Sequence, residues 1–183
     1  AGNTRHYAAT VDKLMQSIGS RDDEIVFGLC VFVNRGRTIV IADTNVIEYP
    51  TSEELASIAK SSARVAKLLG LDPKIAFLSH STFGQPETDR TKRISKAVEM
   101  LKDEKVDFLF DGEMQPDVAL NNKYKGTYSF SNIVGSANVL VMPSIHAAAI
   151  SIKMLKELSR GKVFGPLLIG LAQPIEVAPL RSS

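Results

Sequence analysis

The sequence predicts an α/β sandwich with a mainly parallel, mixed β-sheet. Apolar, strand-like runs alternate four times with amphipathic helical stretches, the order expected when parallel strands are joined by helices. Two early strands are separated only by Asn34-Arg35-Gly36, which is typical of an antiparallel hairpin. The chain has 183 residues, 44% of them hydrophobic, which is enough for one sizeable core.

The first half of the chain is predicted to contain two helices and the hairpin. Asn3 or Thr4 caps the first helix, and Gly19 ends it. Thr51 and Glu54 form a capping box at the start of the second helix. The predicted elements are a helix up to residue 18, strands over 25–33 and 38–42, and a helix over 52–69.

The second half is predicted to complete the sheet with four strands. A helix from about residue 89 and a helix capped by Ser144 cover these strands. One or two helical turns over 117–121 precede a polar connector over 123–135. The predicted strands lie at 75–79, 106–110, 139–142 and 162–171, the last interrupted by Gly165-Pro166.

Three polar clusters are predicted to follow strands that run in the same direction. They are Asp43-Thr44, the stretch from Ser79 to Gly84, and the stretch from Asp111 to Glu113. Because the carboxyl ends of parallel strands share one edge of the sheet, we expect these clusters to converge on one binding site. Hydroxyl groups and backbone N–H groups ahead of a helix suit a phosphate or another anion, although such residues also cap ordinary loops.

Several of these residues allow more than one interpretation. Asp111 and Glu113 are either an acid/base pair, ligands for a cation, or part of an Asp-Gly turn. His80 either contacts a ligand or packs as a hydrogen-bonded side chain. The helix from residue 89 has a basic face, which is either solvated or a contact for acidic phosphates; its members are Arg90, Lys92, Arg93 and Lys96.

Composition argues against several classes of function. The net charge is +2 with both signs interspersed, so nucleic-acid binding is not expected. A membrane span is not expected either, because no run of about 18 apolar residues occurs. The single cysteine, Cys30, fits a reducing, cytoplasmic compartment. The three histidines lack the spacing of a zinc site, and no dinucleotide-binding glycine motif or Walker loop is present.

Four stretches together resemble the phosphate acetyltransferase (phosphotransacetylase) family over nearly the whole chain. They are Ser79-His80-Ser81-Thr82-Phe83-Gly84, the stretch from Asp111 to Leu120, the stretch from Ala137 to Pro143, and the stretch from Gly165 to Pro174. A closer resemblance is to the acetyltransferase-like module at the C-terminus of large bacterial NADP-dependent malic enzymes. Its marks are Thr4-Arg5-His6-Tyr7, the stretch from Ala42 to Val46, Ser81-Thr82-Phe83-Gly84, and the stretch from Ile175 to Pro179.

The resemblance implies a partial phosphotransacetylase-like domain over 1–183, cut from a longer chain. It implies a three-layer sandwich of the isocitrate/isopropylmalate dehydrogenase type. It also implies a preceding malic enzyme core that uses NADP and a divalent metal, with no cofactor in this domain. Acetyl-CoA or another phosphate-bearing ligand is expected to bind here, and the chain is expected to form a homodimer or larger homo-oligomer. The expected ligand-binding residues are Arg5, Thr44, Ser79, Ser81, Thr82, Gly84, Asp111, Glu113, Gly165 and Pro166.

One departure from the family separates the functional interpretations. The phosphate acetyltransferases that this chain resembles carry a catalytic Ser-Arg pair. By count from Pro174, that pair is replaced here by Pro179 and Leu180. Acyl transfer then lacks a hydroxyl for hydrogen bonding or proton transfer and a positive charge to stabilise developing negative charge. No catalytic residue is therefore expected, and no metal-binding residue is expected either. The favoured interpretation is therefore an acetyl-CoA-responsive regulatory and oligomerising domain. The alternatives are a working phosphate acetyltransferase and a purely structural dimerisation domain.

Overall fold

The fold is described from a computed structural model, which places residues 7–21, 24–42 and 46–173. The elements are α1 (Tyr7–Ile18), β1 (Phe27–Asn34), β2 (Arg37–Ala42), α2 (Ser52–Leu68), β3 (Lys74–Leu78), α3 (Asp89–Asp103), β4 (Leu109–Met114), α4 (Pro116–Leu120), the 3-10 helix η1 (Asn122–Lys125), β5 (Val139–Val141), α5 (Ile145–Leu158) and β6 (Lys162–Ile169).

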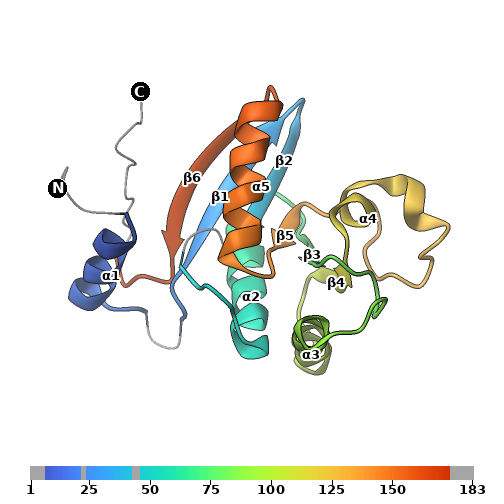
Figure 1. The fold of residues 1–183 in the computed structure, drawn as a ribbon, viewed down its shortest axis with the longest axis horizontal. Helices are drawn as coiled ribbons and strands as arrows, with labels where there is room; N and C mark the ends of the chain where they lie inside the picture. The colour runs from blue at the N-terminus through green and yellow to red at the C-terminus, as the bar shows by residue number, and fades with distance from the viewer. Residues whose placement is uncertain (1–6, 22–23, 43–45, 174–183) are drawn as a thin grey trace.

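The six strands form one mixed sheet in the order β4-β3-β5-β2-β1-β6 (Figure 1). The central neighbours β2, β5, β3 and β4 pair in parallel. β1 pairs antiparallel with both β2 and β6, so it is the strand that runs against the others within the described sheet. The predicted fold class is confirmed, including the antiparallel hairpin at residues 34–37.

Helices cover both faces of the sheet, which makes the three layers. On one face, α2 and α3 pack against the buried side chains of the central strands, among them Ile58, Phe77 and Ile94. On the other face, α4 and α5 cover a second cluster that includes Leu140 and Ile152. Figure 1 shows α5 crossing in front of the sheet and α2 behind it. α1 packs apart from both, where Val11 joins Val26, Leu168 and Leu171.

Local capping signals set the starts of the helices. Thr51 Oγ1 accepts the Glu54 N–H at 3.2 Å, and Glu54 Oε2 accepts the Thr51 N–H at 2.7 Å, which completes the predicted capping box of α2. Thr88 and Thr91 make the equivalent reciprocal pair at the start of α3. Ser144 caps α5, as its place before the apolar periodicity predicts.

The two strands nearest the predicted site differ from their predicted form. β4 covers Leu109–Met114 rather than 106–110, so Asp111 to Glu113 lie inside the strand and not after it. The strand approaches β3 so closely that a Cβ at Gly112 would lie 2.8 Å from the Phe77 Cβ. β6 continues through Gly165-Pro166, where its register against β1 shifts between Leu29 and Val31.

Within residues 7–21, 24–42 and 46–173, no helix combines the length and the apolar character needed to span a bilayer.

Candidate functional site

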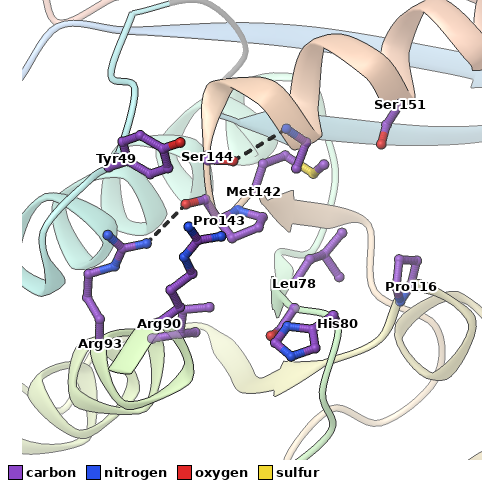
Figure 2. A pocket seen from close by; sticks show the side chains of 13 residues that line it. Tyr49, Leu78, His80, Arg90, Arg93, Pro116, Met142, Pro143, Ser144 and Ser151 are labelled. Carbon is purple, nitrogen blue, oxygen red and sulfur yellow. Dashed lines mark hydrogen bonds between the residues drawn. The ribbon is translucent and has the colours of Figure 1, made fainter. Parts of the chain in front are cut away.

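A cleft of about 330 Å³ opens at the carboxyl ends of β3 and β5, which are neighbours in the sheet (Figure 2). From β3 the chain passes through α3 to β4 on one flank, and from β5 it passes through α5 to β6 on the other. α3 and α5 lie on opposite faces, so the chain diverges at this point and leaves a crevice. Open α/β sheets bind ligands at such a switch point.

Residues from both faces and from two loops line the cleft. Its floor and walls are largely apolar, and its polar groups gather around α3, the start of α5 and the end of β3. The lining residues are Tyr49, Leu78, Ser79, His80, Arg90, Arg93, Ile94, Pro116, Met142, Pro143, Ser144, Ala147 and Ser151.

Two arginines of α3 give the cleft its positive charge. Figure 2 shows Arg90 and Arg93 extending from α3 toward Tyr49, Pro143 and Ser144. Arg93 Nη2 donates to the Pro143 carbonyl oxygen at 3.3 Å, whereas Arg93 Nε is buried and has no hydrogen-bond partner among the described residues. The Arg90 guanidinium carbon lies 5.9 Å from the centre of the Tyr49 ring, a cation–π distance.

The start of α5 adds to this positive field. α5 has 14 residues, and its first turn, capped by Ser144, faces the cleft. The N-terminus of a helix carries a partial positive charge and backbone N–H groups without intrahelical partners. Together with two guanidinium groups above an apolar floor, this arrangement suits a ligand with an anionic head and an apolar or uncharged body.

Of the residues predicted for the site, Ser79 lies in the cleft, next to His80, which also lines it. Ser81, Thr82 and Gly84 do not line the cleft; they fix the loop that presents Ser79. Ser81 Oγ donates to Glu113 Oε1 at 2.9 Å, and the Gly84 N–H donates to the same oxygen. Thr82 Oγ1 accepts the Gln115 N–H at 3.2 Å.

Asp111 and Glu113 accept hydrogen bonds from different partners, so the acid/base pair, one of the three interpretations of these residues, has no support in the structure. Glu113 is 1% exposed, and its other oxygen, Oε2, accepts from Ser95 Oγ of α3 at 2.7 Å. Asp111 instead accepts the N–H groups of Gly112 and Asn132, at 2.9 and 2.7 Å. The two carboxylates therefore hold different segments, the 79–84 loop and the connector before β5, and neither lines the cleft.

Other predicted site residues lie elsewhere. Gly165 and Pro166 form the irregularity in β6 beside β1, where a Cβ at Gly165 would lie 2.7 Å from the Leu29 carbonyl oxygen. They make no wall of the cleft. Arg5 and Thr44 fall outside the described residues, as do Pro179 and Leu180.

The structure separates the basic face of α3 into two groups. Lys92 pairs with Glu87 at 2.8 Å and Lys96 pairs with Glu53 at 3.3 Å, all of them largely exposed. Arg90 and Arg93 line the cleft. Their i, i+3 spacing and the neighbouring Ile94 were signals in the sequence that these two side chains share one side of the helix near the core. Tyr49 had no comparable signal.

Known proteins of one family resemble this chain in both sequence and structure. A family model for phosphate acetyl/butaryl transferases matches residues 1–180. The EutD phosphotransacetylase from Staphylococcus aureus superposes with a TM-score of 0.87 at 29% identity, over 100% of this chain and 56% of that one. These findings agree with the resemblance predicted from the motifs.

Curated relatives are of two kinds. The NADP-dependent malic enzyme of Rhizobium meliloti (strain 1021) is 45% identical over 181 residues, which are 99% of this chain and 24% of that protein. The phosphate acetyltransferase of Bacillus subtilis (strain 168) is 32% identical over 177 residues, 96% of this chain and 55% of that protein. The chain thus spans about a quarter of the one relative and about half of the other.

Proposed function

Because the chain belongs to the phosphate acetyl/butaryl transferase family, we propose that it is the ligand-binding, regulatory domain of an NADP-dependent malic enzyme. In this proposal the cleft between α3 and α5 binds acetyl-CoA or a related phosphate-bearing molecule. The domain responds to that ligand without converting it, and it helps the enzyme to assemble. The parent reaction would be the oxidative decarboxylation of malate to pyruvate.

The observation that carries the proposal is the pair of arginines in the cleft. Both guanidinium groups line the cleft; Arg93 is held through Nη2 by the Pro143 carbonyl oxygen at 3.3 Å, and Arg90 lies beside the Tyr49 ring. A guanidinium group presents five N–H donors in a planar fork that matches phosphate oxygens. The apolar lining from Leu78, Met142 and Pro143 suits the uncharged part of such a ligand.

Regulation without turnover is proposed because of residues 179 and 180. Where phosphate acetyltransferases have a catalytic Ser-Arg pair, the resemblance places Pro179 and Leu180 in this chain. Loss of a single group aimed at a developing oxyanion typically lowers kcat by about 100- to 1000-fold. Loss of the hydroxyl and of the arginine together should leave acetyl transfer near background.

A regulatory effect would follow from linkage. A ligand changes the activity of a distant core only as far as it binds two states of the assembly with different affinity.

NADP and a divalent metal are proposed for the malic enzyme core, outside this domain. Among the described residues no group of three or more His, Cys, Asp or Glu side chains is suited to a metal ion. A cytoplasmic location is part of the same proposal.

The test is a pair of assays on the full-length protein. The first follows acetyl phosphate formation from acetyl-CoA and phosphate, and we expect a rate near background. The second follows malate oxidation with and without acetyl-CoA, and we expect a changed rate that is lost in Arg93→Gln and kept in Lys92→Gln. Robust acetyl transfer would favour the alternative, an active phosphate acetyltransferase such as the Bacillus subtilis relative. An unchanged malate rate would leave a structural role.

Assembly is proposed to use the outer face of α5. Ile150, Met154 and Leu158 are spaced by four residues and each is more than half exposed. A two-fold axis would bring this row against the same row of a second copy and remove both from water. We expect dimers or larger species in sedimentation velocity, and monomers for Met154→Lys. Lys156→Glu, which changes an exposed charge on another side of α5, should not alter the distribution. A monomeric unmodified protein would contradict this part of the proposal.

A further inference from the structure

A chain of hydrogen bonds connects the cleft to the buried carboxylate of Glu113. Ser79 lines the cleft and is 8% exposed; Ser81, fully buried, lies between it and Glu113. Ser79 Oγ and Ser81 Oγ are 3.3 Å apart, and Ser81 Oγ lies 2.9 Å from Glu113 Oε1. Arg90 and Arg93 line the same cleft, so this chain ends at the proposed anion site.

The direction of these hydrogen bonds is determined at the buried end. A carboxylate has no proton to donate, so Glu113 Oε1 accepts from both the Gly84 N–H and the Ser81 hydroxyl. The Ser81 hydroxyl has a single proton and donates it to Glu113. With the Ser81 proton directed to Glu113, Ser79 is the donor in the 3.3 Å contact between the two serines.

Ser79 is left with only an acceptor to offer. Its proton points to Ser81 Oγ, and one lone pair accepts the Ser81 N–H at 3.3 Å. The second lone pair is the group that remains for the cleft. A hydroxyl at the end of a strand is expected to donate to an anion, and this network reverses that role.

From this geometry, and resting on the proposed function of the cleft, we propose that Ser79 makes the anion site selective for anions that carry a proton of their own. Arg90 and Arg93 satisfy the unprotonated oxygens, and Ser79 accepts the remaining O–H. Hydrogen phosphate has such a proton and sulfate has none, although both are tetrahedral dianions at mildly alkaline pH. Sulfate would place an oxygen against the Ser79 lone pair and leave both acceptors unpaired.

The experiment compares inorganic phosphate and sulfate by isothermal titration calorimetry at equal ionic strength and mildly alkaline pH. We expect the unmodified protein to bind phosphate more tightly than sulfate by on the order of tenfold, the effect of one unmade buried hydrogen bond. In Ser81→Ala, Ser79 loses the acceptor for its proton and can turn it toward the cleft. The ratio of the two affinities should then fall toward one, mainly through tighter sulfate binding.

Ser95→Ala is the matched control. It also removes a hydroxyl that donates to Glu113, but this hydroxyl bonds to Oε2, whereas Ser81 bonds to Oε1. If Ser81 only stabilised the loop, both variants would weaken the binding of phosphate and of sulfate equally. The ratio of the two affinities would then stay unchanged. Should Ser81→Ala fail to fold, Ser79→Ala tests the same point, because removal of the acceptor must also lower the ratio.

Two negative outcomes are distinguishable. Equal affinity for phosphate and sulfate in the unmodified protein, or an unchanged ratio in the folded Ser81→Ala and Ser79→Ala variants, would overturn the selectivity and leave the anion site in place. No measurable binding of either anion would overturn the proposed function of the cleft together with this inference.

Discussion

Replacing Arg93 with glutamine is expected to weaken the binding of inorganic phosphate by about 100-fold, the loss typical of a charge-assisted hydrogen bond in a partly buried site. Arg93 Nη2 is held by the Pro143 carbonyl at 3.3 Å and Nε is buried, so the guanidinium group is oriented before a ligand arrives. Glutamine keeps a polar side chain of intermediate length and removes the charge and the planar fork. Calorimetric titration with phosphate measures the change.

The control for this prediction lies on the same helix. Lys92→Gln removes one positive charge from α3, but Lys92 faces solvent and pairs with Glu87. Affinity should stay within about twofold, because an exposed charge outside the cleft is screened by solvent and salt. Arg93→Lys should fall between the two, since it keeps the charge and loses the fork. Unchanged phosphate binding in a folded Arg93→Gln variant would rule out this cleft as the anion site.

Replacing Glu113 with alanine is expected to lower the free energy of unfolding by about 3–5 kcal/mol. The carboxylate is buried and accepts from Ser81 Oγ, Ser95 Oγ and the Gly84 N–H, which would all lose their acceptor. The missing side chain would also leave a cavity between β4 and α3. Ser95 can still donate to the Thr91 carbonyl at 3.1 Å, which limits the loss.

Glu113→Gln distinguishes hydrogen bonding from simple filling of space. Its amide oxygen can replace Oε1 and accept from Ser81 and Gly84, and its NH₂ group can donate to Ser95, so a loss of only about 1 kcal/mol is expected. Glu99→Ala, at an exposed position of α3, should change stability by less than about 0.5 kcal/mol. Urea denaturation of the four proteins provides the measurement. Equal destabilisation by alanine and glutamine would contradict a hydrogen-bonding role for Glu113.

Much of the fold was predictable because its signals are local. The 3.6-residue periodicity of α2, α3 and α5 and the capping groups Thr51 and Ser144 act within one or two helical turns. The hairpin at Asn34 follows from three residues in a row. The alternation of strands and helices then restricts the topology to a mainly parallel sheet, whose carboxyl edge is where ligands bind. The type and order of the elements and the side of the sheet that carries the cleft were therefore determined by the sequence alone.

The members of the site were decided by tertiary structure. The sequence placed Asp111 and Glu113 beyond a strand because, apart from the Gly112 N–H, nothing near them in the sequence pairs with them when buried. Their partners are Asn132, Ser81 and Ser95, 18 to 32 residues away, and only the folded chain brings these donors to the carboxylates.

The same reason applies to the arginines and to Ser79. The basic face of α3 has four similar cations, and the packing of α3 against α2 and β4 decides that Arg90 and Arg93 line the cleft while Lys92 and Lys96 meet surface carboxylates. A serine hydroxyl can donate or accept, so its role depends on the groups around it rather than on its neighbours in the chain. For Ser79, that choice is made by a carboxylate on another strand.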